Sequence, residues 1–469
     1  MRKQYLNSII ALMLCSLLPS IGLAVEDQEM ELQERIRQLE AKLERLEAQQ
    51  PDSSSHQTQA SQPAQDQAAE IEELRRQVQI LAAEIEKLRS GEAENEITAK
   101  QAASIGIGPS ASKVYRKKKG VSLAGYGEML YENFAGQDQA GDPAGKTNQL
   151  DFLRAILYAG YRFNENFVFN SEIEFEHAST GKGGEASVEF AYLEYLANQH
   201  FNLRGGLLLI PMGLTNEYHE PVAFLGARRS ETETRIIPTT WREGGFGVLG
   251  SAGMCSYREY LVNGMNAAGY SSSGLRGGRQ KGAKAKAEDF AFVGRLDFFP
   301  APGMFFGGSL YTGGAGQGQF SESGSNLKVQ TTIGEVHGQV QARGVDLRGL
   351  YAGAKVGDAA AVNRQFVLSG AESIGEVLQG GYIQLGYNTL SQFKETIRLT
   401  PYYRFEKLNT QHQVPDGYAK NPAQDKTIHT LGVEFRPIVN IAIKSEHQWV
   451  RNQASTGVNQ FNINLGYNF

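Results

Sequence analysis

The chain has 469 residues and a formal net charge of −5, with 53 glycines, 14 prolines and 10% aromatic residues. This length allows a large soluble core, so it excludes neither a soluble nor a membrane protein. Beyond the first two dozen residues no apolar run has the length of a transmembrane helix, so membrane-spanning helices are not expected there. The near-neutral charge gives no reason to expect nucleic acid as a partner.

Residues 1–24 have the pattern of a secretory signal peptide. Two basic residues precede an apolar segment from Ile9 to Leu18, and the small residues close to Ala24 suit cleavage. We therefore expect this segment to be removed and exclude it from the fold. Cys255 is then the one cysteine of the mature chain, which excludes an intramolecular disulfide.

Two segments with heptad spacing follow the signal peptide. In 25–50 and 71–89, aliphatic residues recur at alternating spacings of three and four on a charged background, which predicts two short coiled-coil segments. The polar stretch 51–70 between them is typical of a flexible linker. Residues 90–120 form a second predicted linker, which ends in a basic run. The heptads fit either a helical hairpin within one chain or the association of arms from several chains.

From Val121 onward the pattern changes from heptads to alternation of apolar and polar residues. Sixteen candidate strands follow, at 121–133, 148–163, 166–178, 185–197, 202–212, 242–252, 255–265, 287–299, 303–315, 329–341, 345–356, 376–389, 393–408, 426–436, 440–453 and 457–469. Short and long connections mostly alternate between them, which is typical of outer-membrane barrels. We predict an all-β transmembrane barrel of 16 antiparallel strands over 121–469, preceded by a periplasmic coiled-coil arm.

The last predicted strand, 457–469, is the most regular one. Phe461, Tyr467 and Phe469 lie on one face of it, and asparagine and glycine alternate with them on the other face. A strand that alternates in this way and ends on phenylalanine resembles the assembly signal of bacterial outer-membrane barrels. We assign that role to these three residues.

The inner and outer faces of several strands follow from their charges. An arginine or lysine that faces lipid near the middle of a bilayer costs about 2–4 kcal/mol, so charged faces must point inward. The strand 185–197 carries two glutamates of opposite parity, Glu189 and Glu194, which either a β-bulge or an interfacial position could reconcile. The predicted pore-lining residues on strands are Arg154, Arg162, Glu172, Glu174, Glu176, Arg398 and Arg404. They either pair within the wall or create a transverse field across a water-filled pore.

The longest loop, 213–241, is long enough to have a function of its own. Folded inward, it would narrow the pore and present Arg228, Arg229, Arg235 and Arg242 to anionic solutes. The alternative is an extracellular cap with solvated charges. A second loop carries five basic residues between 276 and 286, and could act as a lid, a lipopolysaccharide contact or an anion-attracting mouth.

Motifs around the longest loop carry a family resemblance. They are Leu209-Ile210-Pro211-Met212-Gly213, Asn216-Glu217, His219-Glu220-Pro221 and Pro238-Thr239-Thr240-Trp241-Arg242-Glu243-Gly244-Gly245-Phe246-Gly247. Together with the arm and the terminal phenylalanine, they resemble bacterial porins related to the phosphate-selective porin O and P family and to the DcaP-like trimeric porins. The resemblance implies a sixteen-stranded trimeric channel for small anionic or polar solutes. The sequence lacks a regular arginine ladder on one lumen face, which argues against selectivity for phosphate.

Catalytic and metal-binding patterns do not stand out. The sequence has no Gly-x-Ser-x-Gly elbow and no histidine pair at the helical spacing of a zinc site, so we expect no enzyme, metal or other cofactor. We predict an outer-membrane porin of a Gram-negative bacterium that passes small hydrophilic solutes, anions among them. Its expected partners are two further copies in a homotrimer, outer-membrane lipids and lipopolysaccharide. The alternative is a structural barrel whose coiled coil tethers the envelope or binds a periplasmic partner.

Overall fold

The computed structural model describes residues 106–178, 181, 183–319, 324, 326–393 and 397–469, together with Gln38 and Gln77. The predicted signal peptide, the predicted linker 51–70 and nearly all of the two predicted coiled-coil segments lie outside the described residues. The chain divides into two compact units, Met1–Glu96 and Ile97–Phe469. The strands all belong to the second unit.

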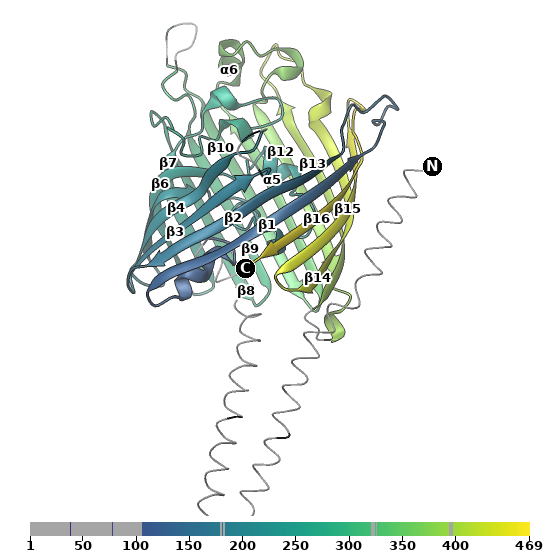
Figure 1. Ribbon diagram of the computed structural model, residues 1–469. Coiled ribbons are helices and arrows are strands. Elements are labelled where there is room, and N and C mark those ends of the chain that lie inside the picture. The colour runs from purple at the N-terminus through teal and green to yellow at the C-terminus, as the bar shows by residue number, and fades with distance from the viewer. Residues whose placement is uncertain are drawn as a thin grey trace, which may run out of the picture. The chain divides into compact units, whose positions relative to one another are not determined.

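Sixteen antiparallel strands close into a barrel (Figure 1). Each strand pairs with its neighbours along the chain, and β1 pairs with β16 to complete the cylinder. The strands are β1 (Gly120–Phe134), β2 (Gln149–Arg162), β3 (Phe167–Glu176), β4 (Ala186–Leu196), β5 (Asn202–Leu209), β6 (Arg242–Ala252), β7 (Cys255–Asn263), β8 (Phe290–Ala301), β9 (Met304–Gly314), β10 (Gln330–Ala342), β11 (Val345–Val356), β12 (Val377–Tyr387), β13 (Arg398–Gln413), β14 (Asp425–Ile438), β15 (Ile441–Asn452) and β16 (Gln460–Asn468). The prediction of a 16-stranded antiparallel barrel is confirmed.

The largest boundary difference concerns β13. The alternation predicts a strand at 393–408, whereas β13 runs from Arg398 to Gln413. Before it the chain forms the short helix η6 (Ser391–Phe393), and at its far end Gln413 stays paired with Val377 of β12. A period of two does not distinguish the end of a strand from an adjoining turn, which explains the shift.

The inner and outer faces of the strands are those expected from their charges. In β3, β13 and β15 the charged faces are buried inside the barrel, and the aromatic and aliphatic faces are more exposed. In β4 a register shift occurs, because Glu172 lies opposite Phe190 while the next residue of β3 lies opposite Val188. Glu189 is therefore an extra residue in a β-bulge, and both Glu189 and Glu194 are buried on the inner side.

The outer surface of the barrel is apolar. Large apolar side chains that are more than 40% exposed come from strands around the whole wall, among them Leu123, Phe175, Phe246, Leu296, Tyr351 and Leu431. An apolar surface of this extent on a closed barrel needs lipid around it. The fold is therefore that of a transmembrane β-barrel.

The first and last strands, β1 and β16, lie side by side and form a seam (Figure 1). Several residues along this seam are glycines. Gly125 and Phe469 exchange two backbone hydrogen bonds, at 2.9 and 3.1 Å. The rings of Phe469 and Tyr467 lie over Gly125 and Gly127, where any added Cβ would collide with them. The aromatic side chains of the last strand thus cover the gap that the glycines leave in the wall. Phe461 lies on the same strand, opposite Asn133 of β1.

The two ends of the barrel differ in their connections. At the turn end the connections are mostly short, at 163–166, 197–201, 253–254, 302–303, 343–344, 388–397 and 439–440, whereas those at the loop end include 210–241, 264–289, 315–329 and 357–376. The other short helices are η1 (Ala111–Arg116), η2 (Pro221–Ala223), α5 (Glu231–Arg235), η3 (Ala267–Gly269), η4 (Arg276–Gly278), α6 (Ala359–Gln365), η5 (Gly370–Glu372) and η7 (Pro422–Gln424). Within the described part of the chain, no helix has the length and hydropathy to cross a bilayer.

The predicted linker 90–120 differs from the structure over its second half. From Gly106 to Arg116 the chain is not extended in solvent but packs through η1 against β1, β2 and β3. Ile107 and Val114 are almost completely buried, because they fill space on the inner side of the wall. The basic residues 117–119 that follow are exposed, as a solvated run would be.

Candidate functional site inside the barrel

The connection between β5 and β6, residues 210–241, lies inside the barrel; we call it the inner loop. Its two ends are joined by Asn216, whose side chain donates to the carbonyls of Ile210 and Trp241 at 2.7 and 2.9 Å and accepts from the Trp241 amide at 2.6 Å. Ile236, Ile237 and Trp241 have no exposed surface and belong to an apolar cluster inside the barrel. The loop is therefore folded and packed rather than free in solvent.

Lys444 of β15 holds the middle of the inner loop. Its ammonium group donates to the carbonyls of Pro221, Phe224 and Gly226 at 2.5, 2.7 and 3.0 Å. It also lies 4.2 Å from the ring centroid of Phe224. An ammonium has three donors and here each finds one carbonyl, so this fully buried lysine is satisfied by the loop backbone.

Acidic and phenolic side chains of neighbouring strands hold the next part of the inner loop. Glu446 of β15 accepts from the amide of Ala227 at 2.9 Å, and Glu406 of β13 accepts from the amide of Thr232 at 2.6 Å. On β12, the strand next to β13, Tyr382 donates to Glu233 at 2.8 Å. Hydrogen bonds to ionised groups are stronger than neutral ones, so these contacts fix the course of the loop across the barrel.

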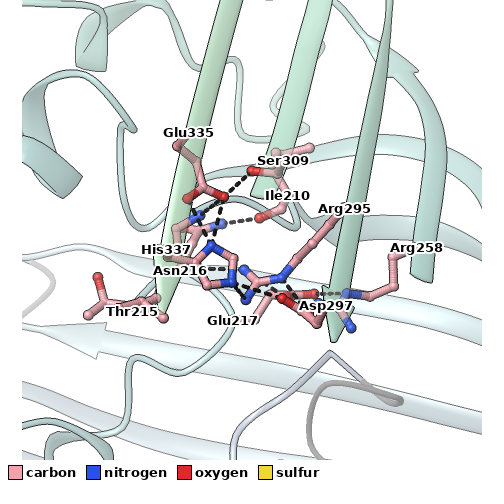
Figure 2. A network of polar contacts seen from close by, with 12 residues as sticks. Ile210, Thr215, Asn216, Glu217, Arg258, Arg295, Asp297, Ser309, Glu335 and His337 are labelled. Carbon is pink, nitrogen blue, oxygen red and sulfur yellow. Dashed lines mark hydrogen bonds and ion pairs between the residues drawn. The ribbon is translucent and has the colours of Figure 1, made fainter. Parts of the chain in front are cut away.

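A buried network of charged residues holds the start of the inner loop (Figure 2). Its members are Glu217 of the loop, Arg258 of β7, Arg295 and Asp297 of β8, Ser309 of β9, and Glu335 and His337 of β10. Asp297 pairs with Arg258 at 3.1 Å and with Arg295 at 2.8 Å, and Arg258 reaches Glu217 at 3.0 Å. Arg295 also donates to the carbonyl of Gly213. The wall charges in this region thus compensate one another and secure the loop.

Four of the eight predicted pore-lining and constriction arginines form an ion pair with a carboxylate among the described residues. Arg154 pairs with Glu128 at 3.2 Å and with Glu174 at 3.3 Å. Arg242 pairs with Glu189 at 2.5 Å, which is the bulged glutamate of β4. These pairs link β1, β2, β3, β4 and β6 on the inner side of the wall. Arg154 and Arg242 are therefore largely neutralised by carboxylates.

Two arginines of the inner loop are also paired. Arg228 contacts Glu132 of β1, and Arg235 donates to Glu231 at 2.6 Å. Burial raises the pKa of Glu231, but Lys426 and Arg235 lower it more strongly, to about 2. Glu231 is therefore ionised at any physiological pH and offsets the charge of Arg235.

The remaining predicted residues divide into two groups by position. Glu172 and Arg404 lie beside the inner loop: Glu172 accepts from His219 at 3.1 Å, and Arg404 donates to the carbonyl of Arg228 at 3.3 Å. Arg162, Glu176 and Arg398 lie at strand ends. Arg162 donates to the carbonyls of the β2–β3 turn rather than to the loop, and Arg398 begins β13 at the turn end.

Three arginines with no acidic partner among the described residues lie together near the loop end; we call them the arginine group. Arg229 comes from the inner loop, and Arg276 and Arg279 come from the 264–289 connection. Arg229 donates to the carbonyl of His219 at 3.3 Å, and Arg279 donates to the carbonyls of Arg276 and Thr240. Burial lowers the pKa of Arg276 to about 9, and the nearby charges of Arg279 and Arg229 act in the same direction.

The sequence did not predict this group as a unit. In the sequence, Arg229 lies in the loop 213–241 and the other two arginines lie in the second loop, and the two segments are far apart in the chain. The signal that was available is the absence of acidic residues from 273 to 287. Contacts bring the segments together, because the amide of Leu275 donates to the carbonyl of Arg235 at 3.0 Å.

Two cavities adjoin the inner loop and are lined by arginines. One has a volume of about 70 Å³ and is lined by Leu214, Glu217, Tyr218, Arg258, Arg295, Phe305, Gln339 and Arg348, among others. The second, of about 10 Å³, is lined by residues that include Arg229, Glu233, Arg348, Tyr382 and Arg404. Arg348 lines both cavities. A larger groove of about 540 Å³ lies on the outer face of β11–β13 and is not part of this interior.

Comparison with known proteins gives a relative at substantial identity. The chain is 39% identical over 353 residues to an uncharacterized protein of Aquifex aeolicus (strain VF5), covering 73% of this chain and 78% of that protein. This chain belongs to the same family. No family model matches the sequence.

Solved structures similar in backbone course include two outer-membrane proteins. OmpF of Salmonella typhi in complex with daunomycin has a TM-score of 0.49 and 12% identity, covering 76% of this chain and 99% of that one. The outer membrane channel DcaP of Acinetobacter baumannii has a TM-score of 0.46 and 13% identity, covering 74% and 97%.

In this member of the Aquifex protein's family, His219 of the inner loop is almost completely buried. Its Nδ1 faces the carbonyl of Asn216 at 2.8 Å and its Nε2 faces the carboxylate of Glu172 at 3.1 Å, so both nitrogens have acceptors. Burial lowers the pKa of His219, but Glu172 raises it more, and Arg229 and Glu189 act as smaller opposing charges. The net pKa is raised, and the ring edge of Tyr126 completes its surroundings.

We expect the inner loop to loosen as the pH rises. A raised pKa means that the charged ring stabilises the folded loop below about pH 6.5, and that this contribution is lost as the pH rises through the raised value. Current noise in planar-bilayer recordings should therefore increase as the pH rises above about 6.5. His219→Gln keeps a donor toward Glu172 without titrating, and should abolish the pH dependence. An unchanged pH response in that variant would assign the effect to another group.

Proposed function

We propose that this protein is an outer-membrane porin through which small hydrophilic solutes diffuse, with a preference for anions and with the inner loop as its constriction. The observation that carries this proposal is the arrangement around the inner loop. The loop runs from its ends at β5 and β6 across the interior to the neighbouring wall strands β12, β13 and β15, and arginine-lined cavities adjoin it. A closed barrel with a loop fixed across its interior is suited to size-limited diffusion.

The preference for anions is supported by which arginines are left without acidic partners. Arg276 and Arg279 stand at the loop end, and Arg229 borders the smaller cavity together with Arg404 and Arg348. Arginines at a narrow, water-poor site attract anions more strongly than they would in bulk water, because the local dielectric is lower. The predicted pore-lining residues that pair with an opposite charge, such as Arg154 with Glu174, would contribute a local dipole instead of a net charge.

The same architecture supports a proposal for the cellular setting. We place the barrel in the outer membrane of a Gram-negative bacterium with the turn end toward the periplasm, since short periplasmic turns and longer outer loops are usual there. The signal peptide, the coiled-coil arm, the homotrimer, and contacts with lipopolysaccharide complete the proposal. Phe461, Tyr467 and Phe469 would act as the assembly signal, and the outward exposure of Tyr467 and Phe469 at the seam supports that role.

Planar-bilayer recording of the purified full-length protein tests the proposal. We expect discrete ion-conducting steps, and a reversal potential under a salt gradient that indicates an excess of anion over cation current. Steps with no anion preference would remove the selectivity claim. A folded protein that gives no steps would contradict the porin function and favour the alternative, a structural barrel whose arm tethers the envelope.

A further inference from the structure

The segment just before β1 is built into the interior of the barrel. Gly106 to Arg116, which we call the N-terminal segment, carries Ile107, Ala111 and Val114 at the spacing of one side of a helical turn, and all three are almost fully buried. Val114 lies over Gly160 of β2, where any Cβ would approach it within 2.7 Å. The carbonyl of Ala111 accepts from Asn170 of β3 at 2.8 Å.

Tyr115 fixes the far end of the N-terminal segment to the wall. Its hydroxyl donates to Glu194 of β4 at 2.7 Å and lies 2.9 Å from the hydroxyl of Tyr192. Arg204 of β5 donates to the same hydroxyl at 3.3 Å. A phenol that is hydrogen-bonded to three buried wall residues is held in one position, so the segment binds the wall at a defined site.

The N-terminal segment also touches the inner loop. Glu220 of the loop accepts from the amide of Ser110 at 2.8 Å with one oxygen, and from Asn468 of β16 at 3.0 Å with the other. Gly106 and Gly108 approach the loop so closely that a Cβ on either would lie 2.4 Å from a carboxylate oxygen of Glu217 or Glu220. The segment and the loop therefore share one packed layer across the interior.

We infer that the N-terminal segment is a second constriction element. It occupies the turn-end side of the interior along β1 to β5 and leaves the cavity lined by Arg258, Arg295 and Arg348 as the exit for solutes. This inference rests on the proposed porin function. It makes the residues just before the first strand, and not only the inner loop, a determinant of the size of solutes that pass.

The full-length chain with residues 107–115 replaced by glycine and serine tests this inference. Single-channel conductance should rise roughly twofold, since conductance follows pore cross-section. Swelling of proteoliposomes should extend to larger neutral sugars, while the anion preference stays, because the arginine group is untouched. Tyr115→Ala in the full-length chain should give a smaller increase in the same direction. Replacing Lys117, Lys118 and Lys119 with serine is the matched control and should leave conductance unchanged, since these side chains are exposed.

The outcomes separate this inference from the porin function itself. Heat-modifiable mobility in gels first establishes that each variant contains a folded barrel. Conductance and sugar cut-off equal to those of the wild type would overturn the second constriction and leave the porin function standing. If the wild type gave no conductance steps while the variant with residues 107–115 replaced did conduct, free diffusion through the wild type would be overturned. The inference would be supported, because the N-terminal segment would then close the barrel. Silence of both proteins would overturn both.

Discussion

Replacing Lys444 with methionine is expected to release the inner loop and to enlarge the channel. Methionine has a similar length but no donors, so the carbonyls of Pro221, Phe224 and Gly226 lose their partner inside the barrel. Each buried polar group left without a partner costs about 1–3 kcal/mol. The unfolding midpoint in urea should therefore fall, and single-channel conductance should rise because the middle of the loop is no longer fixed.

The fluorescence of Trp241 reports whether the inner loop stays packed in this experiment. It is fully buried at the end of the inner loop, whereas the other tryptophan, Trp449, is 37% exposed on the outer surface. In a Trp449→Phe background, the fluorescence of Trp241 should shift toward that of a solvent-exposed indole in the Lys444→Met protein. Lys407→Met is the control, because that lysine is 61% exposed and makes only a 3.7 Å ion pair with Asp425. Equal conductance and fluorescence in both variants would exclude Lys444 as the anchor.

Neutralising the arginine group is expected to remove the preference for anions. Replacing Arg229, Arg276 and Arg279 with glutamine takes away three positive charges that have no carboxylate partner among the described residues, and leaves the acidic residues of the wall in place. The balance of charge along the channel then becomes more negative. Reversal potentials under a salt gradient should move to the cation-selective side, while conductance changes little.

Two controls test whether the change in selectivity is specific to the arginine group. Arg451→Gln removes a charge that is exposed outside the interior, where it donates to Val450 and Asn459, and should leave selectivity unchanged. Replacing Arg228 and Arg235 should have a smaller effect than the triple change, because each already has an acidic partner. If the triple variant kept the wild-type reversal potential, the arginine group would lie outside the route of the ions.

The barrel itself could be predicted closely, because its rule is local. Each strand alternates between lipid and interior, so a charge such as Lys444 or Glu446 reports the inner face without knowledge of any other strand. The same rule reveals an irregularity in β4, where the opposite parity of Glu189 and Glu194 is compatible with a bulge or an interfacial position. The register of β3 against β4 shows that it is a bulge. The rule is less reliable where a strand meets a turn, and the predicted boundaries 393–408 differ from those of β13 for that reason.

The interior could not be predicted in the same way, because its contacts join residues that are far apart in the chain. Lys444 lies more than two hundred residues from the carbonyls that it holds, and Arg276 lies nearly fifty from Arg229. The charges of a wall residue predict that it needs a partner, but several partners of the right sign were available. Only the closed geometry of the barrel decides which of them meet.

By itself the sequence determined the number, order and facing of the sixteen strands, since alternation and the cost of placing charge in lipid act on neighbouring residues. The tertiary structure decided how the interior is filled. The second half of the expected linker is a buried segment that is held in the interior through hydrogen bonds of Tyr115 and Glu220. The tertiary structure also neutralised Arg154, Arg228, Arg235 and Arg242 while leaving the arginine group with no carboxylate partner among the described residues. Both outcomes have the same physical reason: a buried polar or charged group costs free energy unless it has a partner. Only closure of the barrel brings these partners within contact distance.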